Sequence, residues 1–275
     1  MNDYSTLVIW GSLEIHHTGE EDYTGNGIEM NNDTRVLNRG ELSIHHVDME
    51  GDGIDMEDDA LFVNRGNLYI SDIDEEGIDI DNDAIFRNRG LLEIMHVDSD
   101  AIDQGDDDTE FINSGTINIS YIDNEGIEVD DGIFTNTENG EINIAFVSED
   151  MIYMESDGTL ENYGEINLIP APRDRSIEPA PELEEGPDPT EAPDPEVAAD
   201  AEIELYGAIY AEDYGRFVNY NLVDIDFSFN LGSPEEPEPQ QMEYYLVYGS
   251  LVTVNNGIIE NKDCAEINID GPFPI

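Results

Sequence analysis

Cationic side chains are nearly missing from this chain. Its 275 residues hold nine lysines and arginines, with Lys262 the single lysine, against 67 aspartates and glutamates. The net charge of -58 excludes nucleic acid and anionic membranes as partners, because both would repel such a surface. One cysteine, Cys264, excludes an internal disulfide framework. The sequence also lacks an apolar run long enough for membrane insertion and a recognisable signal peptide at its N-terminus.

The excess of acid constrains the conditions in which the chain folds. Mutual repulsion among carboxylates destabilises the folded state in dilute buffer, whereas salt screens the repulsion and divalent cations neutralise it. The composition therefore points to a salty or calcium-rich setting, outside a cell or inside a halophile. We expect no required cofactor, and calcium is the candidate among divalent cations that the chain could bind.

Asparagine recurs at a nearly fixed interval, each time shortly before a glycine. The steps between successive asparagines are 26, 24, 25, 23 and 26 residues. A period in the twenties is typical of a solenoid, in which each coil buries its apolar face only against its neighbours. A side-chain amide can both donate to and accept from neighbouring coils, which predicts a polar ladder at one corner. The asparagines of this ladder are Asn38, Asn64, Asn88, Asn113, Asn136 and Asn162.

Two further phrases recur from coil to coil. The first, seen in Leu42-Ser43-Ile44, and the second, seen in Gly53-Ile54-Asp55-Met56, alternate apolar and polar residues with the period of a strand. Three short strands in about 25 residues make one coil of an all-β parallel β-helix, a β-solenoid, for which right-handed winding is expected. Glycines such as Gly40 and Gly66 close the coils, where we expect tight turns with positive φ.

The repeat is regular over residues 1–169, which are predicted to form about six or seven coils. Residues 170–200 are rich in Pro, Asp and Glu, which is typical of an extended linker or a projecting loop. The pattern returns in degenerate form over residues 201–275, with a second acidic insertion at residues 232–241. We expect further coils in this last part, and a separate small β domain is the alternative.

Histidines gather just after the first apolar phrase of several coils. One position there presents His17, His46, Asp72 and His96 in successive coils. Coils about 4.8 Å apart let imidazoles and a carboxylate reach a single transition-metal ion. The alternative is a corner position that tolerates flat side chains and was copied by duplication.

Two acidic segments, residues 48–59 and 72–83, loosely resemble the calcium loop of an EF-hand. Both place oxygen ligands at alternate positions and glycine at the sixth, but both end in Asp and neither is flanked by a predicted helix. Stacked carboxylates on neighbouring coils also favour diffuse calcium binding. The candidate calcium ligands are Asp48, Asp52, Asp72 and Asp74.

Arg39, Arg65 and Arg89 follow the ladder asparagine in three successive coils. Such a row of guanidinium groups can bind a sulfated or uronic glycan, or it can pair with neighbouring carboxylates and relieve their repulsion. Catalytic carboxylate pairs cannot be recognised among 67 acidic residues. Because the coils differ little from one another, whereas a catalytic site breaks a repeat locally, we expect no catalytic residues and no enzyme.

The phrases GLLEI, GIDI, IFRNRG and FINSGTINIS resemble the β-helix repeats of bacterial secreted and cell-surface proteins, including adhesin-like and filament-like ones. The resemblance covers about residues 11–169. It implies an extracellular structural or adhesive role, and it says more about fold than about function because such repeats arise by duplication in unrelated proteins.

The ends of the predicted solenoid suggest a role in assembly. A β-helix has two open ends whose backbone groups need partners, and the sequence predicts no amphipathic helix to cap them. We therefore expect self-association end to end into an extracellular fibre, stalk or matrix, with calcium bridging. The alternatives are an adhesin that holds a glycan or metal on one face, and a polysaccharide lyase or glycosidase.

Overall fold

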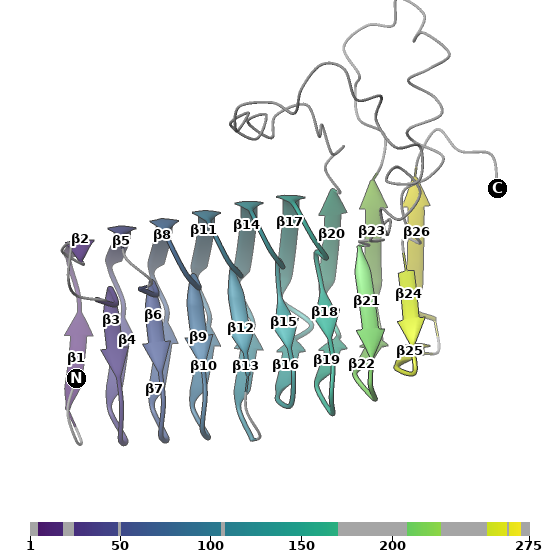
Figure 1. Cartoon of the computed structure of the whole chain (residues 1–275), viewed down its shortest axis with the longest axis horizontal. Helices are drawn as coiled ribbons and strands as arrows, with labels where there is room; N and C mark the ends of the chain where they lie inside the picture. The colour runs from purple at the N-terminus through teal and green to yellow at the C-terminus, as the bar shows by residue number, and fades with distance from the viewer. Residues whose placement is uncertain are drawn as a thin grey trace, which may run out of the picture.

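The computed structural model describes residues 5–18, 25–48, 51–105, 108–169, 208–226, 252–262 and 264–270. Every element in these ranges is a strand, and no helix in them is long and apolar enough to cross a membrane. Coils of three strands stack along one axis, as Figure 1 shows, and equivalent strands of neighbouring coils run parallel. The prediction of an all-β parallel solenoid is confirmed.

The strands form three faces along the stack. In the described part, the first face is one nine-stranded sheet: β1 (Thr6–Ile9), β4 (Arg35–Asn38), β7 (Leu61–Asn64), β10 (Ile85–Asn88), β13 (Glu110–Asn113), β16 (Ile133–Asn136), β19 (Thr159–Asn162), β22 (Arg216–Asn219) and β25 (Ile258–Asn261). The second face is another: β2 (Ser12–Thr18), β5 (Glu41–Val47), β8 (Asn67–Ile73), β11 (Leu91–Val97), β14 (Thr116–Ile122), β17 (Glu141–Val147), β20 (Glu165–Ile169), β23 (Leu222–Asp226) and β26 (Glu266–Asp270).

The third face has the shortest strands and is divided into two four-stranded sheets. The first sheet contains β3 (Ile28–Met30), β6 (Ile54–Met56), β9 (Ile78–Ile80) and β12 (Ile102–Gln104). The second contains β15 (Glu128–Val129), β18 (Tyr153–Met154), β21 (Ile209–Glu212) and β24 (Val252–Asn255). A backbone hydrogen bond of 3.0 Å from the amide of Asp130 to the carbonyl of Gln104 joins the two sheets.

Two coils after residue 207 continue the same sheets. β21, β22 and β23 pair in parallel with β18, β19 and β20, and β24 to β26 pair with them in turn. Residues 170–200 and 232–241, for which we predicted a linker or loop and an insertion, lie outside the described residues.

The core consists of inward columns in which each side chain lies on its counterpart in the next coil. Phe62, Phe86, Phe111 and Phe134 are fully buried and stack with ring centroids 4.8, 4.8 and 4.5 Å apart. The strand spacing fixes these distances, because parallel strands about 4.8 Å apart present identical side chains in register. Burial of each ring contributes roughly 1.5 to 3 kcal/mol to folding.

A left-handed residue bends each strand of the second sheet at its corner. In β5, Leu42 and Ile44 point inward two residues apart, and Val47, three residues further, is buried as well. The change of spacing is made by His46, whose φ is 57°. This conformation, which ordinary residues rarely adopt, rotates the chain so that one extra side chain points out and the next aliphatic points in.

The closing glycines are required for a different reason from the one we predicted. Neither Gly40 nor Gly66 has φ in the left-handed region. Instead, a Cβ atom on Gly66 would collide with the backbone oxygen of Gly40, and one on Gly40 would collide with that of Gly11. Close approach of neighbouring turns therefore leaves no room for a side chain at Gly40 or Gly66.

Candidate functional site

The third face carries a continuous row of outward carboxylates, which we call the central row. It comprises Glu29 on β3, Asp55 on β6, Asp79 on β9, Asp103 on β12 and Glu128 on β15. The first four are direct register partners of one another. Their inward neighbours, such as Ile78 and Ile80, are fully buried, so strand alternation forces every one of these acids onto the outer surface.

A second row of acids lies just before the short strands. It contains Asp52, Glu76, Asp100 and Glu125, each two residues ahead of a buried isoleucine. The aspartates of this row accept hydrogen bonds from the next coil. Oδ1 of Asp52 accepts from the backbone amide of Glu76 at 3.2 Å, and Oδ1 of Asp100 accepts from the backbone amide of Glu125 at 2.7 Å. The short Asp side chain reaches the amide of the next coil, in the manner of an Asx cap.

A third row follows the short strands and includes Glu57, Asp81, Asp130 and Glu155. From β18 onward the central row changes to tyrosine, because Tyr153 and then Tyr210 take the place of Glu128. The hydroxyl of Tyr153 lies 2.7 Å from Oε2 of Glu155 and 2.6 Å from a carboxylate oxygen of Glu212. We call the three rows from β3 to β15 the acidic face.

Crowding on the acidic face shifts the proton affinity of its members. Burial raises the pKa of Asp79 to about 9, and the neighbouring Asp81 and Asp103 carboxylates contribute to the rise. Burial likewise raises the pKa of Glu128 to about 9, with Asp100 as the next cause. Among the described residues, no ion pair is formed by Asp55, Asp79, Asp103 or Glu128. Crowded carboxylates of this kind favour either protonation or the binding of a cation from solution.

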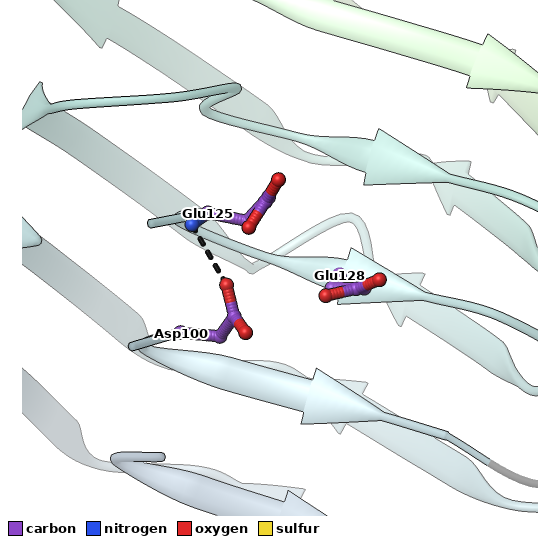
Figure 2. Close-up of side chains that lie close together, drawn as sticks. All are labelled: Asp100, Glu125 and Glu128. Carbon is purple, nitrogen blue, oxygen red and sulfur yellow. Dashed lines mark hydrogen bonds between the residues drawn. The ribbon is translucent and has the colours of Figure 1, made fainter. Parts of the chain in front are cut away.

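The carboxylates converge most closely at the junction of β12 and β15. One oxygen from each of Asp100, Glu125 and Glu128 lies within 4.8 Å of the others, and Figure 2 shows the three groups facing a common space. Asp100 is 4% exposed and Glu125 is 9% exposed. Oε2 of Glu125 is buried and has no hydrogen-bond partner. Buried carboxylate oxygens arranged in this way could hold a hard divalent cation.

A second group of the same kind adjoins the first. Glu128, Asp130 and Glu155 also bring one oxygen each within 4.8 Å of the others, so Glu128 belongs to both groups. Oδ1 of Asp130 is buried without a hydrogen-bond partner. The two groups make the part of the acidic face around β15 its densest region of converging oxygen atoms among the described residues.

The ladder asparagines are joined by side-chain hydrogen bonds. Each Nδ2 donates to Oδ1 of the next asparagine at 2.8 to 2.9 Å, and the chain of amides extends past Asn162 to Asn219 and Asn261. All members from Asn38 to Asn219 are fully buried. This column is an internal structural element and offers no site to a ligand.

The histidine column lies at the corner of the second sheet. His46, Asp72 and His96 are exposed in successive coils, and Nδ1 of His96 lies 3.7 Å from Oδ1 of Asp72. His96 stacks on Tyr121, with ring centroids 5.1 Å apart. The side chain of His17 lies outside the described residues. Among those described, neither group of converging metal ligands includes a histidine.

The four candidate calcium ligands occupy three different columns. Asp52 lies in the acidic face, Asp72 in the histidine column, and Asp48 and Asp74 at exposed positions directly after the long strands β5 and β8. Neither group of converging oxygens contains any of the four. The structure thus does not bring the four together at one site.

Arg39, Arg65 and Arg89 are exposed in one column of the first sheet's closing turns. The guanidinium carbon of Arg39 lies 4.6 Å from the centroid of the Trp10 ring, a cation–π geometry. None of the three forms an ion pair with a described carboxylate. The expected pairing with carboxylates is therefore not found in the described part of the chain.

Sequence reasoning missed Asp100, Glu125, Glu128, Asp130 and Glu155 as members of one site. The signal that finds them is the alignment of coils on the buried isoleucines, which brings Asp100 and Glu125 together just ahead of Ile102 and Ile127. Without coordinates, these residues do not stand out among 67 acidic positions.

Comparisons with known proteins give the chain no family: no family model, no curated protein and no solved structure matches it.

Proposed function

We propose that this protein is a non-enzymatic structural solenoid that takes up divalent cations, calcium in the first place, along its acidic face. The observation that carries the proposal is the acidic face itself, where five successive short strands each present a carboxylate over an apolar core, the first four of them in direct register. Glu125 adds a buried oxygen without a partner. Cations would neutralise the face and stabilise the coils, since ligands that bind only the folded state raise its stability.

We propose an extracellular setting on the same grounds. Extracellular calcium modules operate with dissociation constants of about 10⁻⁴ to 10⁻³ M, in the range that a partly exposed carboxylate surface supplies. The net charge of -58 makes a screened, calcium-rich environment favourable for the folded chain.

The test compares ions at matched ionic strength. Urea unfolding is followed by circular dichroism after chelation, and then with calcium, magnesium or sodium chloride added. We expect calcium to raise the unfolding midpoint clearly more than sodium does, because binding adds to screening. Equal midpoints in calcium and sodium would contradict the proposal, since screening alone would then explain the effect of salt.

End-to-end assembly is a second candidate, favoured by the ends of the described solenoid. Inward residues that are fully buried in the middle coils become partly exposed there: Leu13 corresponds to the buried Leu42, and Ile259 to the buried Phe217. A second copy whose first coil continues the sheets of the last would cover these residues.

The asparagine ladder places a condition on such a junction. Ile9 takes the ladder position in β1, and Nδ2 of Asn261 donates to the carbonyl of Ala265 in its own coil at 2.8 Å. The amide ladder is thus closed at both ends, and a junction would rest on backbone pairing and apolar contact.

Gly11 offers a specific test of the junction. A Cβ on Gly11 meets nothing within 4 Å, whereas one on the equivalent Gly40 collides with the preceding coil. If a second copy docks before the first coil, Gly11→Ala should prevent fibres in electron micrographs while leaving the unfolding midpoint unchanged. Two outcomes would contradict end-to-end assembly. One is that the native chain and Gly11→Ala form fibres equally; the other is that neither forms fibres with any cation added.

A further inference from the structure

We infer that Asp100, Glu125 and Glu128 form a discrete calcium centre, which binds before the rest of the acidic face. The inference rests on the proposed function and adds a site of defined composition to it. Its three ligands come from two neighbouring coils, so the bound ion would also link β12 to β15 across the division between the two short-strand sheets.

The unpartnered oxygen of Glu125 is the first reason. Glu125 is 9% exposed, its buried Oε2 accepts no hydrogen bond, and without a cation only a proton shared with the Asp100 carboxylate can satisfy it. Burying a carboxylate oxygen without a partner is costly, so native proteins satisfy such atoms with a donor or a metal ion. A cation in the space that Asp100, Glu125 and Glu128 share would meet this requirement (Figure 2).

The second reason is that Asp100 is held in place before any ion arrives. Its Oδ1 accepts from the backbone amide of Glu125 at 2.7 Å, and its Oδ2 accepts from the side-chain Nδ2 of Asn124 at 3.3 Å. Each carboxylate oxygen keeps a second lone pair for a metal. Fixed ligands lower the ordering cost of binding, which strengthens a metal site.

The donor set selects the ion. Three carboxylates supply up to six oxygen ligands and neither nitrogen nor sulfur, which favours a hard cation over zinc or copper. Calcium accepts six to eight oxygens in irregular geometry, whereas magnesium demands a near-ideal octahedron and retains its waters. Ligands contributed by two coils at unequal depths fit calcium better.

A matched set two coils earlier shows why the site forms only here. Asp52, Glu76 and Asp79 occupy the positions equivalent to Asp100, Glu125 and Glu128. The central residue there is the shorter Asp79, and Oε1 of Glu76 accepts from the hydroxyl of Ser99 at 3.1 Å. These three residues are not among the converging groups of the described chain. Glu76 is therefore a control with the same residue type, row and strand position.

The experiment is a calorimetric calcium titration of the chelated full chain and of two variants, Glu125→Gln and Glu76→Gln. We expect the native chain and Glu76→Gln to show a strong first equivalent followed by weak uptake. Glu125→Gln should weaken the first equivalent at least about tenfold and leave the weak uptake intact. The new amide can donate to Asp100, so the variant should fold, which its unfolding midpoint without calcium verifies.

The outcomes separate the inference from the function on which it rests. Weak and uniform calcium uptake by the native chain, or the same loss in both variants, would overturn the discrete centre while the cation-binding solenoid stands. A native chain that binds no calcium at all would overturn both. Terbium luminescence reports where the ion binds. Tyr153 is the register partner of Glu128 and should sensitise the luminescence of a terbium ion bound beside it. Tyr153→Phe should remove that signal without changing calcium affinity.

Discussion

The side-chain amide of Asn88 donates to Oδ1 of Asn113 across 2.9 Å, and neither side chain is accessible to solvent. The same Nδ2 also lies 3.1 Å from the carbonyl of Thr116, and Oδ1 accepts from the amide of Gly90 at 3.3 Å. One side chain thus joins the next ladder member, the next coil's second strand and its own turn. These buried polar groups find their hydrogen-bond partners only when neighbouring coils are in register. The ladder therefore helps to determine the register of the coils.

Asn113→Asp should therefore destabilise the solenoid strongly. In the native chain, Nδ2 of Asn113 donates to Oδ1 of Asn136 at 2.9 Å and to the carbonyl of Glu141 at 3.2 Å. A carboxylate oxygen in that place would face two acceptors without a proton to give. We expect a loss of about 3 to 5 kcal/mol, as for other uncompensated buried charges, measured by urea unfolding.

Asn118→Asp provides the matched control. Asn118 lies on the outer side of β14, where its Oδ1 only accepts, from Nδ2 of Asn143 at 3.0 Å. An aspartate keeps that acceptor and remains in contact with solvent, so the loss should stay below about 1 kcal/mol. Equal losses in the two variants would show that added negative charge, and not the ladder, governs the result.

Gly66→Ala tests whether close approach of turns requires glycine. The new Cβ would collide with the backbone of Gly40, which cannot move without shifting a whole coil. We expect a loss of about 1 to 3 kcal/mol, the usual cost of overpacking, in the unfolding free energy. In the monomer Gly11→Ala should change it little, because a Cβ there has no neighbour within 4 Å. A neutral Gly66→Ala would show that the neighbouring turns can separate enough to admit a side chain, and would contradict the close-approach explanation.

Phe86→Ala removes one ring from the middle of the aromatic stack. Phe86 is fully buried, with the rings of Phe62 and Phe111 on either side at 4.8 Å. A cavity of that size should cost about 3 to 5 kcal/mol by urea unfolding. Phe86→Leu should cost clearly less, since Leu160 already follows Phe134 in the same column. If Phe86→Leu lost more unfolding free energy than Phe86→Ala, the column would tolerate a cavity better than a side chain of different shape.

The columns were predictable from the sequence because their residues must repeat with the coil. Asn64 and Asn88 could be matched by spacing alone, and the structure pairs them directly. The acidic site was not predictable in this way. Outward positions are acidic throughout, and what distinguishes Glu125 from Glu76 is the length of the central residue and a hydroxyl from Ser99. Such differences act between coils, at distances that local spacing does not encode.

The acidic face also predicts how stability depends on pH in the absence of divalent cations. Burial, reinforced by neighbouring carboxylates, raises the pKa of Asp52 to about 8, of Asp79 and Glu128 to about 9, and of Glu125 to about 10. In the unfolded chain these groups titrate near pH 4. Between the two ranges the folded state holds more protons than the unfolded state, so raising the pH favours unfolding.

With respect to these groups, stability in chelator should thus be fully present below about pH 4, and should fall progressively from there until the pH has passed about 8 to 10. Urea unfolding midpoints at several pH values test this. In Glu128→Gln the midpoint should decrease less with pH, because the glutamine amide does not ionise. Calcium should oppose the fall, since it takes the place of the protons that leave. A midpoint that rises with pH in chelator would mean that the carboxylates of this face are ionised and compensated in the folded protein without a cation.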